Sequence, residues 1–391
     1  MKDPVVIVGQ ARTALGEFRG ALSALGAPAL GAVAIRAAVT RAGVDAQAID
    51  AVFMGCVLSA GLGQAPARQA AIAAGLPWSV PCTTVNKVCG SGMQAVMLAH
   101  DGLLAGSLQR AVAGGMESMS NAPYLLPKAR TGLQLGHGQL LDHLFTDGLE
   151  DPFEPGRRMG EYAEDCAAAI GCPREDQDAW ALESLRRARA AIDEGAFAGE
   201  ISGCAVPERG GGTWVDVDQH PLHARAERIA RLPPVFRADG SVTAGNASAI
   251  ADGAAALVLM RASAAANLGL PVLARIRGHA TQAQRGWTDA PAAAVRKLCA
   301  AIGWRIADVD LWEINEAFAV IAIAALRELG LAHAQVNVHG GACALGHPIG
   351  CSGARLLVTL IAALQRHGLR RGIATLCIGG GEATAVAVER G

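Results

Sequence analysis

The sequence predicts an α/β protein built from two copies of one unit, with a helix from each copy enclosed between two sheets. Three landmarks recur at a nearly constant offset, which is typical of an internal repeat. The pairs are 50–55 with 310–315, Ser91 with Ser352, and Glu117 with Glu382, at offsets of 260, 261 and 265 residues. Chance matching of glycine-rich pieces is the alternative explanation.

The two helices that open at the second landmark are expected to be buried. Between residues 92 and 104 the one charged residue is Asp101, and between 352 and 364 it is Arg355. A helix that is apolar nearly all round is covered on every side. We therefore expect these two helices in the central layer of a sandwich, between two sheets.

The remaining elements follow in chain order, with apolar runs predicting strands. The expected strands lie at 5–8, 50–55, 111–113, 310–315 and 373–378. The stretch between the two copies holds most of the prolines and much of the charge, and it includes an amphipathic helix at 174–194. An insertion this polar is expected to form a lid or a binding domain. The predicted domains are 1–118 with 245–270, the insertion 119–244, and 271–391.

Composition narrows the class of protein. The 391 residues suit two or three domains, and 51% of them are hydrophobic while 18% are charged, against about 25% in a typical protein. The formal net charge of −1 disfavours a nucleic-acid or anionic-membrane partner. Ten cysteines without a Cys-x-x-Cys pair, and no signal sequence or spanning segment, predict a cytoplasmic protein with reduced thiols.

Cys89 is the first candidate for chemistry. It lies at a predicted strand-to-helix turn, where free N–H groups and the helix dipole favour the thiolate. Gly90 and Gly92 leave room for a substrate to reach the sulfur. A buried structural cysteine is the alternative interpretation.

A second segment, 337–350, combines histidine and cysteine. His339, Cys343, His347 and Cys351 recur every four residues, a spacing that would align metal ligands on a helix. Several glycines and Pro348 make a continuous helix implausible, so no metal site is expected. A histidine in such a loop before a buried helix is better placed as an acid/base or as an oxyanion donor.

Two further strand ends carry polar groups. Cys377 and Ile378 are followed by three glycines, whose N–H groups can form an oxyanion hole. Asn315 and Glu316 interrupt an apolar context, so they must be hydrogen-bonded there, although helix capping alone would also explain them. Ligands bind at such edges of α/β sheets, and we therefore expect these groups to share one site.

Taken together, these segments resemble the signature motifs of the thiolases, the CoA-dependent acyltransferases. The motifs are 86–92, 315–319, 346–350 and 377–381, with 114–120 and 243–248 matching as well. The resemblance covers the whole chain in the family's order. It implies a thiolase fold, a duplicated five-layer αβαβα core with an inserted loop domain.

The resemblance also implies a ping-pong Claisen condensation and its reverse, thiolysis. Cys89 would be the acylated nucleophile, His347 would accept its proton, and Cys377 would be the second acid/base. Asn315, through a water, would bind the enolate oxygen together with His347. The N–H groups of Cys89 and Gly379 would hold the oxyanion of the acyl-enzyme.

By the same resemblance, coenzyme A is substrate and product, and no metal or redox cofactor is needed. The residues expected to bind acyl-CoA are Met159, Ala247, Ser248, Trp287 and Phe318. The resemblance favours the joining of two acetyl-CoA into acetoacetyl-CoA and CoA, with its reverse. A degradative 3-ketoacyl-CoA thiolase of fatty acid metabolism is the alternative, and a non-catalytic acyl-CoA-binding scaffold is a third reading. The segment 124–153 resembles a loop that ties two dimers together, so a homodimer or homotetramer is expected.

Several positions depart from the family pattern. Trp287 stands where methionine is usual beside the acyl group, His339 replaces an asparagine, and Glu382 replaces a methionine. Leu222 falls near where some members carry an arginine, a role that Arg225 would take over. These changes leave the chain-length preference and the direction of the reaction open.

Overall fold

The structure, a computed structural model, describes residues 3–208 and 211–391. Met1 and Lys2, which the sequence places just before the first strand, lie outside the described residues. The first half contributes the strands β1 (Val5–Arg12), β10 (Ala251–Arg261), β5 (Arg110–Ser118), β3 (Ala51–Gly55) and β4 (Cys82–Val85). The second half contributes β11 (Ala274–Ala283), β14 (Glu382–Glu389), β13 (Arg371–Ile378) and β12 (Leu311–Ile314).

The strands of the two halves pair in the same way, which confirms the predicted repeat. In the order β1-β10-β5-β3-β4, β3 lies parallel to its neighbours and β10 lies antiparallel to β1 and β5. In the order β11-β14-β13-β12, β12 is parallel to β13 while β14 is antiparallel to β13 and β11. A single parallel bridge between Trp312 and Val336 stands where the first half has β4.

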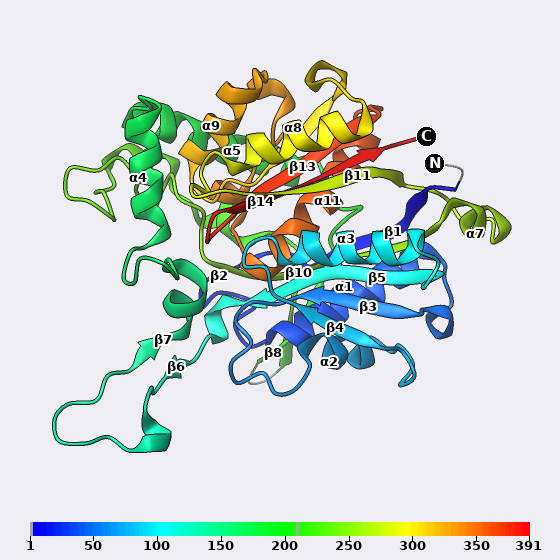
Figure 1. The fold of residues 1–391 in the computed structure, drawn as a ribbon, viewed down its shortest axis with the longest axis horizontal. Coiled ribbons are helices and arrows are strands. Elements are labelled where there is room, and N and C mark those ends of the chain that lie inside the picture. Colours follow the sequence, from blue (N-terminus) through cyan, green and yellow to red (C-terminus); the bar gives the residue numbers. More distant parts are fainter. Residues whose placement is uncertain (1–2, 209–210) are drawn as a thin grey trace.

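Helices complete five layers, as Figure 1 shows. α3 (Ser91–Leu104) and α11 (Ile349–Arg366) contact each other and strands of both halves, so they form the central layer. α1 (Ala27–Ala42) and α2 (Pro66–Ala73) cover the first sheet from outside. α8 (Ala290–Ile302) covers the second sheet, with α9 (Ala319–Leu329) beside it. The predicted αβαβα architecture is therefore confirmed.

Two features differ from expectation. The two sheets are joined at one edge, where Val6 and Ile7 of β1 pair with Arg275 and Ala274, so the strands form one continuous folded sheet. In addition, α3 is not enclosed on every side: Leu98 is 39% exposed and Leu104 37% exposed. The apolar composition of α3 therefore overstated its burial within one chain, whereas α11 is buried from Ile349 to Ile361.

The lone arginine of α11 has a buried partner. Arg355 pairs with Glu313 of β12 at 2.9 Å, and both side chains are almost fully enclosed. Burial raises the pKa of Glu313 to about 8, against the opposing effect of the Arg355 cation. A buried pair of this kind is strongly destabilised if one partner is removed. It fixes α11 against the strand that leads into Asn315.

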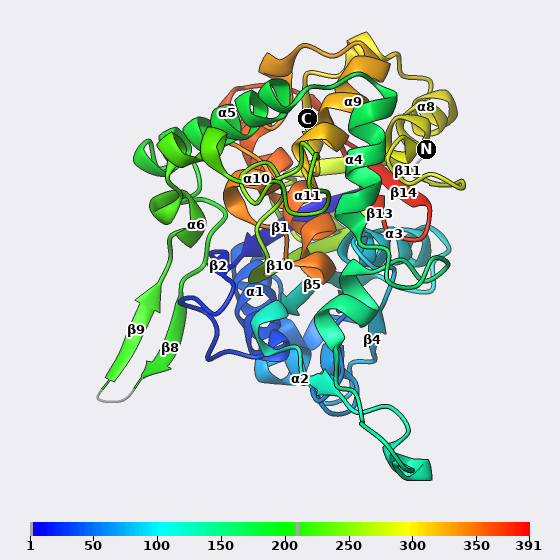
Figure 2. The same cartoon turned by 90° about the vertical axis from the view of Figure 1, so that its left-hand side faces the viewer.

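The insertion lies against one side of the core (Figure 2). Its elements are the hairpin strands β6 (Tyr124–Leu125) and β7 (Leu141–Asp142), α4 (Met159–Ala169), α5 (Arg174–Asp193), the hairpin β8 (Cys204–Glu208) and β9 (Gly211–Val215), and α6 (Gln219–His223). The helix predicted at 174–194 is α5, which packs on α9 and on α10 (Ala342–Leu345). The short elements β2 (Gly16–Glu17) and α7 (Ala262–Asn267) complete the regular strands and α-helices of the described chain.

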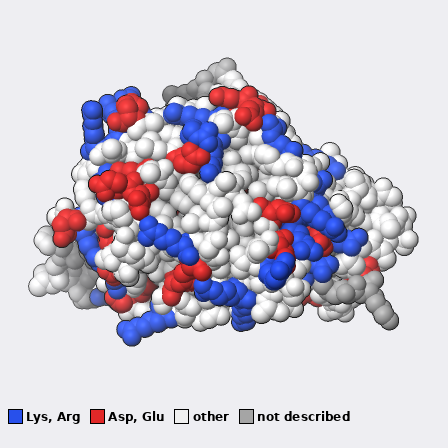
Figure 3. Space-filling view, turned by 90° about the horizontal axis from the view of Figure 1, so that it is seen from above, with Lys and Arg blue, Asp and Glu red and all other residues white. Residues whose placement is uncertain are grey.

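The surface carries both signs of charge. On the face seen in Figure 3, Lys and Arg side chains alternate with Asp and Glu side chains and do not gather into one large basic area. Among the described residues, no helix combines the length and the apolar character needed to cross a membrane.

Candidate active site

Cys89 lies in the loop between β4 and α3, and its sulfur faces a loop of the other half. The backbone N–H groups of Gly379 and of Cys89 itself lie against the sulfur. Gly90 packs so tightly on Ile378 that an added Cβ would overlap the isoleucine side chain. The preceding Val88 has a φ of +46°, a strained conformation for a β-branched residue. The two halves thus meet at Cys89.

The resting state of Cys89 differs from the expected thiolate. Burial raises the pKa of Cys89 to about 11, and the nearby Glu117 carboxylate raises it further, while the two N–H groups lower it. Because α3 begins at Ser91, the sulfur lies just outside the helix, where desolvation outweighs the helix dipole. Cys89 therefore rests as a thiol and needs a base to ionise it.

His347 is held as a neutral base. Its Nδ1 lies 2.5 Å from Ser352 Oγ, and that hydroxyl donates its own proton to the Pro348 carbonyl at 2.9 Å. Nδ1 therefore carries the imidazole proton and donates to Oγ, so Nε2 keeps its lone pair. Burial lowers the pKa of His347 to about 3, with a smaller contribution from Arg355.

Ser352 was missed as a site residue by the sequence analysis. The available signal was its place in the first turns of the helix directly after His347.

Asn315 faces the free nitrogen of His347. Its Nδ2 lies 3.3 Å from His347 Nε2, and its backbone N–H donates to the Thr375 carbonyl at 3.0 Å. Its buried Oδ1 has no partner among the described residues. A buried carbonyl oxygen without a partner is a natural position for an ordered water.

Glu316 fixes Asn315 against the insertion. The Glu316 carboxylate accepts hydrogen bonds from Trp180 Nε1 at 2.9 Å and Ser184 Oγ at 2.8 Å, both on α5. It also accepts from Asn337 Nδ2 at 2.8 Å and from the Cys343 N–H at 3.0 Å. No side chain caps α9, so helix capping does not explain the polar pair.

Cys377 is the second thiol of the site. It is the penultimate residue of β13 and is 1% exposed. Burial raises the pKa of Cys377 well above the usual value, and the neighbouring Cys89 sulfur adds to the effect. Cys377 is thus a thiol at rest, able to give up a proton only to a strong base.

A buried acid, Glu117, supports the site from behind. Its carboxylate accepts the N–H groups of Val57, Leu58 and Gly350 at 2.9–3.1 Å. Burial raises the pKa of Glu117 to about 7, although these N–H groups oppose the shift. Through Gly350 it anchors the start of α11, three residues after His347. The sequence analysis used Glu117 as a landmark of the repeat and assigned it no role.

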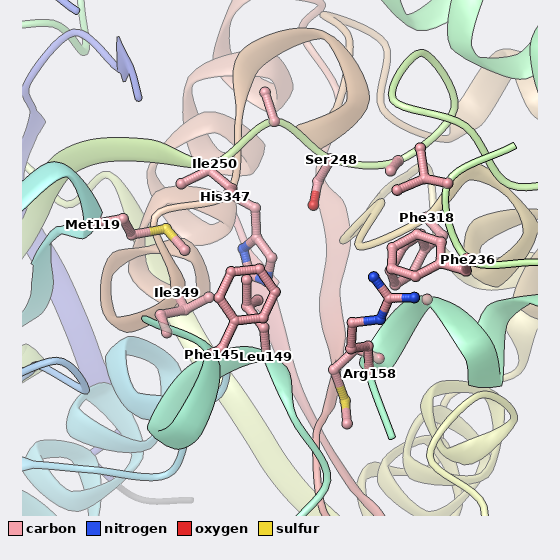
Figure 4. A pocket seen from close by; sticks show the side chains of 15 residues that line it. Met119, Phe145, Leu149, Arg158, Phe236, Ser248, Ile250, Phe318, His347 and Ile349 are labelled. Carbon is pink, nitrogen blue, oxygen red and sulfur yellow. The ribbon is translucent and has the colours of Figure 1, made fainter. Parts of the chain in front are cut away.

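A pocket of about 230 Å³ leads to His347 from the insertion side. Its lining includes Met159, Ala247, Ser248 and Phe318, four of the five residues expected to bind acyl-CoA. Figure 4 shows the Ser248 hydroxyl and the His347 ring facing the cavity. Most of the lining is apolar, as suits the arm of a long thioester.

Trp287, the fifth expected residue, lies behind the side chains that line the pocket. It is 3% exposed, and its ring centre is 6.5 Å from that of Phe318 and 6.2 Å from that of Tyr162. Trp287 therefore supports Phe318 and is not among the lining residues. Arg158, which the sequence analysis did not select, lines the pocket and supplies a cation.

The four-residue spacing of 339–351 produces no ligand cluster. α10 covers only four residues of it and ends at Leu345, because the next residue, Gly346, has a φ of +105°. Within the described chain, the one group with mutually close metal-ligating atoms is His100, Asp101 and His279. That group lies near the end of α3 away from Cys89.

A neutral imidazole that lines an apolar pocket, together with two neighbouring thiols and two backbone N–H donors at one of them, is the set of groups that acyl-transfer enzymes use. Comparison with known proteins gives the family. The family models described as "Thiolase, N-terminal domain" and "Thiolase, C-terminal domain" match residues 5–263 and 270–390. The chain belongs to the thiolase family, and it is an acyltransferase.

Relatives and solved structures agree with this assignment. The chain is 50% identical to an acetyl-CoA acetyltransferase of Pseudomonas aeruginosa, with all of both chains covered. It is 50% identical to acetyl-CoA acetyltransferase 2 of Arabidopsis thaliana, over 98% of this chain and 96% of the relative. The structure of an acetyl-CoA acetyltransferase from Syntrophomonas wolfei matches with a TM-score of 0.96 and 38% identity over all of both chains.

Proposed function

We propose that this protein condenses two molecules of acetyl-CoA to acetoacetyl-CoA and CoA, and catalyses the reverse thiolysis. The observation that carries the proposal is a pair of contacts: the Cys377 and Cys89 thiols are close neighbours, and Asn315 faces the His347 ring that lines an apolar pocket. We propose that these two pairs form one site at the end of that pocket, as the family motifs imply. The choice of acetyl-CoA as substrate rests on the names of the full-length relatives, which are acetyl-CoA acetyltransferases.

Acylation uses both resting thiols. His347 Nε2 takes the proton of Cys89, and the thiolate attacks the thioester carbonyl of the first acetyl-CoA. The oxyanion forms between the N–H groups of Cys89 and Gly379. The carbon–sulfur bond to CoA breaks, and Cys377 gives its proton to the departing CoA thiolate. The products are free CoA, acetylated Cys89, an imidazolium and a Cys377 thiolate.

Condensation restores the resting state. The Cys377 thiolate removes a proton from the methyl group of the second acetyl-CoA. The enolate oxygen accepts a hydrogen bond from the imidazolium of His347 and from a water held by Asn315. The enolate carbon attacks the acetyl carbon, acetoacetyl-CoA forms, and the Cys89 thiolate recovers its proton from His347. The raised pKa values of both cysteines suit this cycle, because each is ionised only when its own step begins.

The proposed reaction uses CoA as substrate and product, and its steps need only groups of the chain. The apolar pocket also suits a degradative 3-ketoacyl-CoA thiolase acting on longer chains, which is the second candidate. Thiolysis rates for 3-ketoacyl-CoA of four to ten carbons distinguish the two: a short-chain enzyme loses kcat/KM steeply beyond the four-carbon substrate.

The role of Cys377 is tested by Cys377→Ala. We expect acetyl-CoA to acetylate Cys89 in this variant, because CoA thiolate leaves without an acid, while acetoacetyl-CoA formation falls at least about a hundredfold. Mass spectrometry of the peptide that contains Cys89 measures the first step. An unlabelled Cys89, or condensation at the wild-type rate, would contradict the division of roles.

For assembly, we propose a homotetramer built from two dimers. The hairpin of β6 and β7 extends away from the core (Figure 1) and exposes large apolar side chains. They are Tyr124, Leu126, Leu133, Leu135 and Leu140. The helix α3, which exposes Leu98 and Leu104, contacts the edge strand β4, and this supports a second interface.

We also propose a cytoplasmic location and the three-part division predicted from the sequence. The ten cysteines, all within the described part of the chain, are unpaired thiols, as suits a reducing compartment. The insertion at 119–244 carries its own helices and hairpins outside the duplicated layers.

A further inference from the structure

One ion pair joins the loops that meet at Cys89. Lys87 lies two residues before Cys89, and Glu382 lies three residues after Gly379. Lys87 Nζ pairs with Glu382 Oε2, although the two residues are 295 positions apart. The side chains are 21% and 32% exposed, so the pair is partly shielded from solvent.

The two loops each hold one donor of the oxyanion hole. The N–H of Cys89 belongs to the first half and the N–H of Gly379 to the second, and both lie against the same sulfur. Donors of this kind act only when they lie about 2.7–3.1 Å from the developing oxyanion. The separation of the loops therefore determines whether both donors reach one oxygen.

Apolar contacts between these loops accompany the ion pair and the N–H of Gly379. Gly90 packs on Ile378, and Val88 lies near Gly379, where an added Cβ would be 3.9 Å from Val88 Cγ1. Apolar contacts have little directional preference. A charge-assisted hydrogen bond has a defined length, and it can therefore set a separation that apolar packing leaves adjustable.

Both ends of the ion pair stand on fixed backbone. The Lys87 N–H donates to Ser91 Oγ at 2.8 Å, and its carbonyl accepts the Gly90 N–H at 3.0 Å. Glu382 opens β14, where it pairs with Ile378 on one side and Ala283 on the other. Loss of the ion pair would therefore shift the two loops that carry the N–H donors.

We propose, on the basis of the acyl-transfer function above, that Lys87 and Glu382 are positioning residues that hold the two halves of the oxyanion hole in register. A partly exposed pair adds little to folding stability. Its contribution is therefore expected in the rate of acyl transfer.

The test measures acetylation of Cys89 by acetyl-CoA in full-length Lys87→Met, Glu382→Gln and the double variant Lys87→Met/Glu382→Gln. Each single variant is expected to lower the maximal acetylation rate about tenfold, with the half-saturating acetyl-CoA concentration changed less than about twofold. The donors act on the transition state, so the rate falls while ground-state binding remains. The double variant is expected to lose no more than either single variant, because the pair acts as a unit.

Glu382→Asp, which keeps the charge, is expected to recover at least half of the lost rate. Glu328→Gln is the matched control, since it removes the acid of an exposed ion pair with Arg296 far from the site, and it should acetylate at the wild-type rate. Thermal unfolding of each variant reports folding separately.

The positioning role would be overturned if the single variants acetylated Cys89 at the wild-type rate. It would also be overturned if only the half-saturating acetyl-CoA concentration changed, or if the two tenfold losses multiplied in the double variant. Failure of the wild-type protein to acetylate Cys89 would overturn the proposed function itself, so the two results are distinguishable.

Discussion

At the scale of single residues, proton positions decide the chemistry of this site. The Ser352 hydroxyl donates its only proton to the Pro348 carbonyl. It can therefore only accept a hydrogen bond from His347 Nδ1. The base that faces the pocket is consequently Nε2, next to Asn315. The reactive histidine thus depends on a hydroxyl one turn into α11.

Replacement of Ser352 by alanine tests this dependence. Without its acceptor, the Nδ1–H of His347 is unsatisfied and the tautomer with a free Nε2 is no longer favoured. We expect kcat for acetoacetyl-CoA thiolysis to fall about tenfold to a hundredfold with KM little changed. Steady-state kinetics measures both, and Ser107→Ala in an exposed turn is the control. An unchanged kcat would show that packing alone orients the ring.

At the scale of elements, the close approach of α11 to β5 fixes the start of α11, just after His347, against the first half of the chain. Gly115 of β5 lies directly against the Gly350 carbonyl of α11, and an added Cβ there would collide with that oxygen. Glu117, two residues further along β5, holds the N–H of the same Gly350. Strand and helix therefore share one anchoring point behind the site.

Gly115→Ala should disrupt this anchoring point. The backbone carbonyl cannot rotate away as a side chain can, so α11 must shift, and we expect a loss of about 3 kcal/mol in the free energy of unfolding. Urea denaturation at pH 7 measures it. Gly199→Ala is the matched control, because nothing lies within 4 Å of a Cβ there and the φ of Gly199 is outside the left-handed region. Equal stabilities of the two variants would contradict the packing argument.

His339, on the loop before α10, makes an acid-sensitive contribution to stability. Burial lowers the pKa of His339 to about 4, and the nearby His367 and Arg366 add to the shift. Between pH 6.5 and 4 the unfolded chain binds a proton there and the folded chain does not, so stability falls as the pH falls.

His339→Asn removes that titration. We expect the variant to lose up to about 3 kcal/mol less stability than wild type between pH 6.5 and 4. Urea unfolding at a series of pH values gives the two slopes. Parallel curves would show that His339 titrates alike in the folded and unfolded chains.

At the scale of the whole molecule, the surface divides into a mixed-charge exterior and a few apolar regions that a monomer leaves uncovered. The hairpin of β6 and β7 is the clearest of these, since it projects from the core and exposes Leu126, Leu133, Leu135 and Leu140. Apolar surface on a projecting hairpin is typical of an interaction site.

Replacing residues 127–139 by a short Gly-Ser linker tests the assembly. We expect the wild-type protein to sediment as a tetramer and the shortened protein as a dimer, because the edge strand β4 and α3 remain. Analytical ultracentrifugation at several concentrations measures both. A tetramer without the hairpin, or a monomeric wild type, would contradict the proposed arrangement.

The sequence by itself determined the repeat and the two central helices, because glycine spacing and apolar runs are local properties of the chain. The order of its motifs determined the family, and through that resemblance it predicted the five layers and the four candidate reactive side chains. The tertiary structure decided the protonation states of those groups in the resting protein. Desolvation depends on every neighbour, and it makes Cys89 a thiol where the helix end alone suggested a thiolate. The same holds for the exposed face of α3, the position of Trp287 behind Phe318 and the ion pair between Lys87 and Glu382, since each joins segments that lie far apart along the chain.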